Sequence, residues 1–137
     1  MATRVTPTFG IRAWDERPWH EGENGRKLTR ATVTKTYEGA LQGEGTMEYV
    51  MAYADTARAT FVGIERFEGS LDGRSGSFVM KDVGRFEDGV AASWFEILPG
   101  SGTGDLQGIR GSATVDAVKA DTQTMTLDYD LEADPDN

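Results

Sequence analysis

The chain has 137 residues, with 14 Lys and Arg against 23 Asp and Glu, which gives a formal net charge of −9. This acidic balance argues against a nucleic-acid partner, because such binding depends on a basic face, and against anionic membranes. The chain contains no cysteine, which excludes disulfides, thiol nucleophiles and thiolate metal ligands. It also lacks a transmembrane-length apolar run and a signal peptide, so we expect a cytoplasmic protein. We expect a single domain over 1–137, ordered over about 8–131.

Short segments with alternating apolar residues dominate the chain, and no window shows a convincing helical period. The segment 8–16 alternates weakly, and 17–25 carries the turn signals Pro18 and Asn24-Gly25. The segment 28–37 is rich in threonine and predicts a strand with a polar face. The predicted strands, in chain order, are 8–16, 28–37, 46–53, 59–67, 77–81, 90–98, 106–115 and 124–131.

The predicted strand 59–67 is apolar on both faces. Phe61 and Phe67 lie on one face, and Val62 and Ile64 lie on the other. A strand that is apolar on both faces is expected to be covered on both sides, and a second subunit could supply the outer cover. The segment therefore favours a homo-oligomer.

A glycine pattern recurs along the chain. Gly-x-Leu-x-Gly-x-x-Gly-Ser is present at 69–77 and at 104–112, and a shorter version is present at 39–45. Glycine within a strand pattern indicates a bulge, a bend or a close backbone approach. The stretch 98–112 does not match a dinucleotide or phosphate-binding loop, because position 105 is Asp and no Gly-Lys-Ser/Thr follows. Eight short strands with repeated glycine corners predict an all-β, eight-stranded antiparallel barrel.

Several stretches carry a family resemblance that covers most of the chain, from about 8 to 131. These stretches are 14–16, 63–69, 73–78, 98–104 and 127–129. They resemble an uncharacterised family of small bacterial proteins, similar in fold to the allene oxide cyclase barrel and more loosely to dirigent proteins. The resemblance implies an eight-stranded antiparallel barrel, often oligomeric, and no established reaction. Relatives commonly carry a His where this chain has Asp82, so any chemical role of that His would be missing here.

Glu65 is the candidate catalytic residue. It shares a strand face with Gly63 and Phe67, and if that face points inward, burial would raise the pKa of the carboxyl and suit it to general acid or base chemistry. Alternatively, Glu65 pairs with an arginine to lock a corner of the sheet. The candidate arginines for such a pair are Arg66, Arg74 and Arg110. The sequence leaves the inward face open, because a slip of one residue in the preceding turn exchanges the two faces.

Aromatic side chains are the candidate ligand contacts, with core packing as the alternative reading. The predicted ligand-binding residues are Tyr49, Tyr53, Phe67, Trp94 and Tyr129. His20 is the only histidine and lies in the predicted loop, so we expect neither a metal site nor a serine triad. Nothing in the sequence calls for a cofactor.

The sequence thus predicts a barrel that binds a small, mostly apolar molecule. The alternative is a cofactor-independent cyclase or isomerase, in which the barrel folds a flexible substrate and excludes water. A third reading is a filled barrel that acts through its outer surface. The sequence does not identify the ligand.

Overall fold

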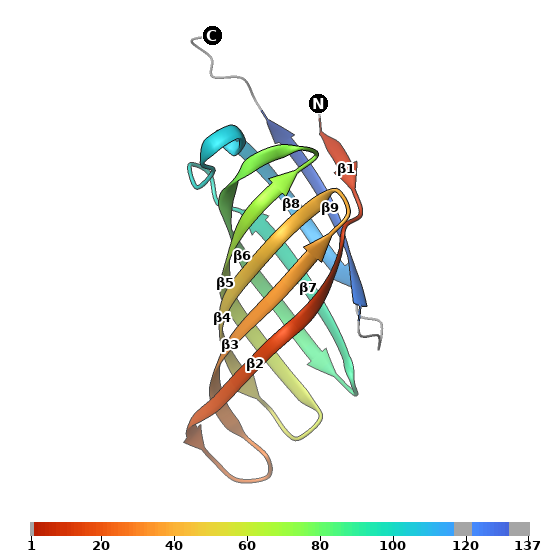
Figure 1. The fold of residues 1–137 in the computed structure, drawn as a ribbon. Helices are drawn as coiled ribbons and strands as arrows, with labels where there is room; N and C mark the ends of the chain where they lie inside the picture. The colour runs from red at the N-terminus through yellow and green to blue at the C-terminus, as the bar shows by residue number, and fades with distance from the viewer. Residues whose placement is uncertain (1, 117–121, 132–137) are drawn as a thin grey trace.

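The computed structural model describes residues 2–116 and 122–131, and the turn expected at 119–121 lies outside them. The described chain is all-β except for one three-residue 3₁₀ turn (Figure 1). Its strands are β1 (Thr3–Val5), β2 (Thr8–Glu21), β3 (Lys27–Glu38), β4 (Leu41–Tyr53), β5 (Arg58–Leu71), β6 (Arg74–Glu87), β7 (Val90–Ile97), β8 (Ile109–Asp116) and β9 (Thr122–Leu131). The 3₁₀ turn, η1, spans Gly104–Leu106.

The strands form one antiparallel sheet that closes on itself. Each strand from β2 to β8 pairs with the strand that follows it in the chain. β9 then pairs with β2 through Thr8–Gly10, which closes the ring of hydrogen bonds. The short strand β1 pairs with residues 127–129 of β9, on the same edge of β9 that β2 pairs with further along. Pro7 lies between β1 and β2, and its carbonyl accepts a hydrogen bond from the Met125 N–H. The prediction of an all-β antiparallel sheet is confirmed, and β1 is an additional strand that the sequence reading missed.

Most strands are longer than predicted, and two of these differences matter most. β2 runs to Glu21 through the segment expected as a loop, and β6 runs from Arg74 to Glu87 rather than over 77–81. The part of β2 beyond Gly10 pairs only with β3 among the described residues. Pro18 is tolerated there because an edge strand can lack one N–H, and the register shifts between Pro18 and His20. His20 is therefore an exposed strand residue rather than a loop residue.

The repeated glycines mark places where strands approach closely. Gly43 and Gly69 lie opposite each other on β4 and β5, and a Cβ on either would overlap the backbone of the other strand. Gly76 likewise leaves room for the Thr103 carbonyl. The third copy of the pattern contains η1 at Gly104–Leu106, so β8 begins at Ile109 rather than near 106.

The interior of the closed sheet differs between its two ends. Large apolar side chains with no exposed surface fill the end near η1. They include Leu41, Phe67, Leu71, Phe78, Leu106 and Leu127. At the other end, the β2–β3 hairpin extends beyond the other strands (Figure 1). This end is less tightly filled and holds the candidate site.

The outer face carries a row of apolar side chains across four neighbouring strands. Val50, Val62, Val83 and Trp94 are in register on β4, β5, β6 and β7, and each is between 41% and 48% exposed. Val62 and Ile64 thus lie on the outer face of β5, opposite the buried Phe61 and Phe67. The homo-oligomer inferred from this strand stays a prediction.

Candidate functional site

A cavity of about 220 Å³ lies inside the closed sheet, at the end away from η1. Its lining is mostly apolar and comes from all eight strands of the closed sheet. The lining residues are Phe9, Ile11, Trp14, Val33, Lys35, Tyr49, Met51, Tyr53, Phe61, Phe86, Ala91, Ser93, Phe95, Val115 and Gln123. A volume of this size corresponds to about seven water molecules of bulk liquid, which is enough for a small organic molecule.

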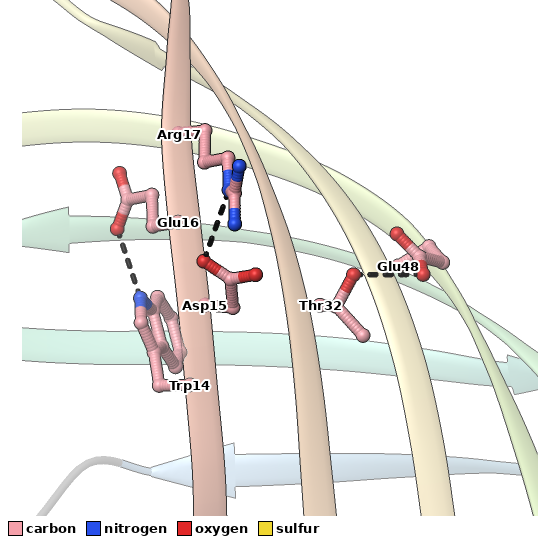
Figure 2. Close-up of polar contacts among 6 residues, drawn as sticks. All are labelled: Trp14, Asp15, Glu16, Arg17, Thr32 and Glu48. Carbon is pink, nitrogen blue, oxygen red and sulfur yellow. Dashed lines mark hydrogen bonds and ion pairs between the residues drawn. The ribbon is translucent and has the colours of Figure 1, made fainter.

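The cavity opens beside β2. β2 leaves β9 after Gly10, so Ile11 and Trp14 lie at a side of the sheet that the described residues do not close. These two side chains are 43% and 47% exposed. Figure 2 shows Trp14 and Glu16 projecting to one side of β2, with Asp15 and Arg17 on the other. The alternation places the Trp14 indole at the cavity mouth.

Glu16 holds the aromatic side chains of the mouth in place. Its carboxylate accepts hydrogen bonds from the Tyr53 hydroxyl at 2.6 Å, the Thr29 hydroxyl at 2.8 Å and the Trp14 indole N–H at 3.0 Å. Burial acts to raise the pKa of Glu16, but these hydrogen bonds outweigh it and lower the pKa below its usual value. Glu16 is therefore an ionised anchor for two of the lining residues.

Five buried polar side chains meet inside the sheet, and we call them the buried polar cluster: Lys35, Tyr37, Tyr49, Glu65 and Asp82. Lys35 Nζ lies 2.8 Å from Glu65 Oε1, and the Tyr37 hydroxyl donates to Glu65 Oε2 at 2.5 Å. The Tyr49 hydroxyl donates to Asp82 Oδ2 at 2.7 Å. Only Lys35 and Tyr49 of this cluster also line the cavity.

Glycines make room for the cluster. Gly45 and Gly63 are inward-facing positions of β4 and β5. A Cβ on Gly45 would overlap Glu65 Oε2, and one on Gly63 would overlap the Tyr49 ring and the backbone of β4. The side chains of Glu65 and Tyr49 occupy the space that these glycines leave empty.

The two carboxylates of the cluster are in different environments. Glu65 has both oxygens hydrogen-bonded, to Lys35 and to Tyr37. Asp82 Oδ1 is buried and has no hydrogen-bond partner within the described part of the chain. Burial raises the pKa of Asp82 to about 6, partly offset by the Tyr49 hydrogen bond and the charge of Lys35. Asp82 can therefore change its protonation near neutral pH.

Both tyrosines of the cluster stay protonated. Burial, reinforced by the neighbouring carboxylates Glu65 and Asp82, raises the pKa of Tyr37 and of Tyr49 well above the usual value. Each phenol is thus held as a hydrogen-bond donor to its carboxylate. Because Tyr49 also lines the cavity, it connects the cavity to Asp82.

The structure does not bring the predicted site residues together in one place. Tyr49 and Tyr53 line the cavity, and Glu65 lies behind it with no exposed surface. Phe67 packs in the filled part of the interior and is not part of the lining. Trp94 lies on the outer face, 48% exposed and beside Arg85.

Tyr129 is also separate from the cavity. Its hydroxyl donates to Asp72, and burial together with Asp72 raises its pKa to about 12. Glu65 pairs with Lys35 and Tyr37 in place of the arginine partner considered from the sequence. Its inward orientation resolves the face that the sequence left open.

The sequence reading missed Lys35 and Tyr37. Lys35 lies on the buried face of β3 with Ala31 and Val33, and a charged residue on an otherwise apolar face is the signal that could have found it. Asp82 entered the sequence reading only as the position where relatives commonly carry a His, and the predicted fifth strand ended at 81, one residue before it. The described residues contain no group of three His, Cys, Asp or Glu side chains that could hold a metal ion.

None of the helical structure among the described residues is long and apolar enough to cross a membrane. The class that the fold and cavity define is a small all-β protein with a closed antiparallel sheet and an apolar interior site.

The chain belongs to the DUF3224 family, described as proteins of unknown function, whose family model matches residues 5–129. It is similar to the crystal structure of a DUF3224 protein of unknown function from Shewanella oneidensis MR-1, with 28% identity and a TM-score of 0.79. That similarity covers 97% of this chain and 100% of the other. No curated protein matches the chain. The prediction of an uncharacterised family is confirmed, and the likeness to allene oxide cyclase stays a prediction.

Proposed function

We propose that the closed sheet is a β-barrel, of the allene-oxide-cyclase-like type, that binds a small, mostly apolar molecule in its cavity. The observation that carries this proposal is the cavity itself, whose lining includes seven aromatic side chains and few polar ones. Ligand sites in proteins are typically concave and apolar, with a small number of polar groups that fix orientation. Here Lys35 and Tyr49 supply those polar groups.

The test compares two phenylalanine substitutions on β7. Ala91 lines the cavity, whereas its neighbour Ala92 faces the other side of the strand opposite Arg85. We expect naphthalene to bind the wild-type protein in a calorimetric titration. Ala91→Phe should weaken this binding about tenfold or more, because the added ring occupies the cavity. Ala92→Phe should bind as the wild type does, and equal loss in both variants would contradict the proposal.

A second candidate is a cofactor-independent isomerase or cyclase that acts on the bound molecule. Asp82 favours it, because a carboxyl with a pKa of about 6 and an unpartnered oxygen is suited to acid–base work near neutral pH. Tyr49 would connect Asp82 to the cavity contents. Glu65 would hold Lys35 in place, since both its oxygens accept hydrogen bonds.

Proton exchange separates the enzyme from the passive binder. The molecule that co-purifies with the protein from its native cells would be identified by native mass spectrometry and incubated with the protein in D₂O. The isomerase alternative expects deuterium uptake into carbon positions with the wild type and much less with Asp82→Asn. Absence of uptake with the wild type would favour binding alone.

We also expect the chain to self-associate through the outer apolar row. Native mass spectrometry of the wild type should then show a multiple of the 14.9 kDa chain mass. Val62→Lys places a charge in the centre of the row and should yield single chains. Thr46→Lys, on the outer face of β4 but outside the row, is the control and should keep the assembly. A wild-type mass of one chain would contradict this expectation.

A further inference from the structure

The side chain of Lys35 has hydrogen-bonding capacity that the protein does not use. An ammonium group carries three N–H donors. Among the described residues, Nζ has one hydrogen-bond acceptor, Glu65 Oε1 at 2.8 Å. Nζ also lies over the faces of Phe9 and Phe95, whose ring centroids are 4.7 and 5.1 Å away, and its charge acts on the Asp82 carboxyl. Lys35 is only 3% exposed, so two donors of a buried cation lack an oxygen partner.

These unused donors belong to a residue of the cavity lining. Lys35 lines the cavity, whereas Glu65 and Asp82 do not. The lining around it is mostly aromatic and aliphatic, so a bound molecule would find there few other strong hydrogen-bond donors. A buried polar group without a partner is costly, and an acceptor atom on the ligand would remove that cost.

The charges of the buried polar cluster decide what kind of acceptor fits. One ammonium, Lys35, is accompanied by two carboxyl groups, Glu65 and Asp82. A carboxylate on the ligand would add a third negative group to a site with a single cation, and its desolvation would be poorly compensated. A cationic ligand group would instead be repelled by Lys35 at the cavity wall. A neutral oxygen accepts the hydrogen bond without adding charge.

We propose that the molecule bound in the cavity is a neutral carbonyl compound, such as an apolar ketone or aldehyde, whose oxygen accepts a hydrogen bond from Lys35 Nζ. This inference rests on the proposed binding function and deepens it by naming the ligand class. The aromatic lining contacts the apolar part of the ligand, and Lys35 selects the oxygen and orients it. Glu65 in turn fixes the direction in which the ammonium points.

Three probes with one bicyclic skeleton test the proposal: naphthalene, 2-acetylnaphthalene and 2-naphthoate. Each would be titrated calorimetrically into the wild-type protein at pH 7.5. The ketone should bind about tenfold or more tightly than naphthalene, as expected for a hydrogen bond to a charged donor. The carboxylate should bind more weakly than the ketone. In Lys35→Met/Glu65→Gln, which removes the ion pair as a unit, ketone and naphthalene should bind about equally.

The outcomes separate the two proposals. If none of the probes binds the wild type, the binding function itself fails. If all three bind equally, the cavity binds apolar molecules but the role of Lys35 is overturned. Tightest binding of 2-naphthoate would show an anion site instead. A ketone preference that survives in the folded double variant would also overturn the proposal, and the wild-type ranking decides the matter alone if that variant does not fold.

Discussion

Replacing Lys35 by methionine is expected to lower the free energy of unfolding by about 3–5 kcal/mol, because the substitution leaves a buried carboxylate without its cation. Glu65 has no exposed surface, and Lys35 Nζ is its only cationic partner among the described residues. The hydrogen bond from Tyr37 cannot neutralise the remaining charge. Urea unfolding at pH 7.5, followed by far-ultraviolet circular dichroism, measures the effect.

The double variant Lys35→Met/Glu65→Gln separates two causes of destabilisation, the unpaired charge of Glu65 and the loss of side-chain packing. Because both charges are removed together, it should lose much less stability than the two single variants combined. A matched control is the surface pair Arg66–Glu68 on the same strand as Glu65, whose side chains are 56% and 69% exposed. Arg66→Met should change the stability by less than about 1 kcal/mol. If Lys35→Met were equally mild, Glu65 would not be charged in the folded protein.

Asp82→Asn is expected to stabilise the protein at pH 8, by about 2–3 kcal/mol. The folded protein holds the pKa of Asp82 at about 6, against an ordinary value of 3.8, and each unit corresponds to about 1.36 kcal/mol. The folded state therefore binds this proton more tightly than the unfolded chain does. The stability that this provides is complete below about pH 3.8 and is lost as the pH rises through about 6.

The pH dependence of the difference is the decisive readout. The asparagine side chain of the variant does not titrate, so the stability difference between the variant and the wild type should be largest at pH 8 and shrink towards zero as the pH falls to 4. Urea unfolding at intervals across this range measures the difference. The contributions of the other carboxyl groups to the pH dependence are the same in both proteins and cancel. Asp55 and Asp128 have pKa values lowered by hydrogen bonds, so their effect on stability has the opposite sign in both proteins. A difference that is independent of pH would contradict the assignment.

Alternation along the strands was sufficient to predict the sheet. Residues two apart share a face, so the patterns in 46–53 and 124–131 defined strands that the structure contains within β4 and β9. The repeated glycines indicated close approaches, and Gly43 and Gly69 do face each other across β4 and β5. Strand ends were less predictable. The turn signal of Pro18 was overridden by pairing with β3, which only the folded chain supplies.

Glu65 illustrates which features of the site can be predicted from a local stretch of sequence and which cannot. Its strand and its neighbours on the face were readable from the sequence, because they depend on a period of two. Its partners were not, since Lys35 and Tyr37 are 30 and 28 residues away in the chain. Which residues meet across the interior is set by how eight strands close and by their mutual register, and neither is encoded in any one segment.

The sequence by itself determined the all-β class, the antiparallel strands and the acidic, cysteine-free character of this protein, because these follow from composition and from periodicity within single segments. Only the tertiary structure decided that Trp94 lies outside, that Tyr129 pairs with Asp72 away from the cavity, and that Lys35 and Tyr49 face it. The physical reason is that a cavity is a property of the closed sheet. It exists where the side chains of eight strands fail to fill the space between them, and no strand specifies that space alone.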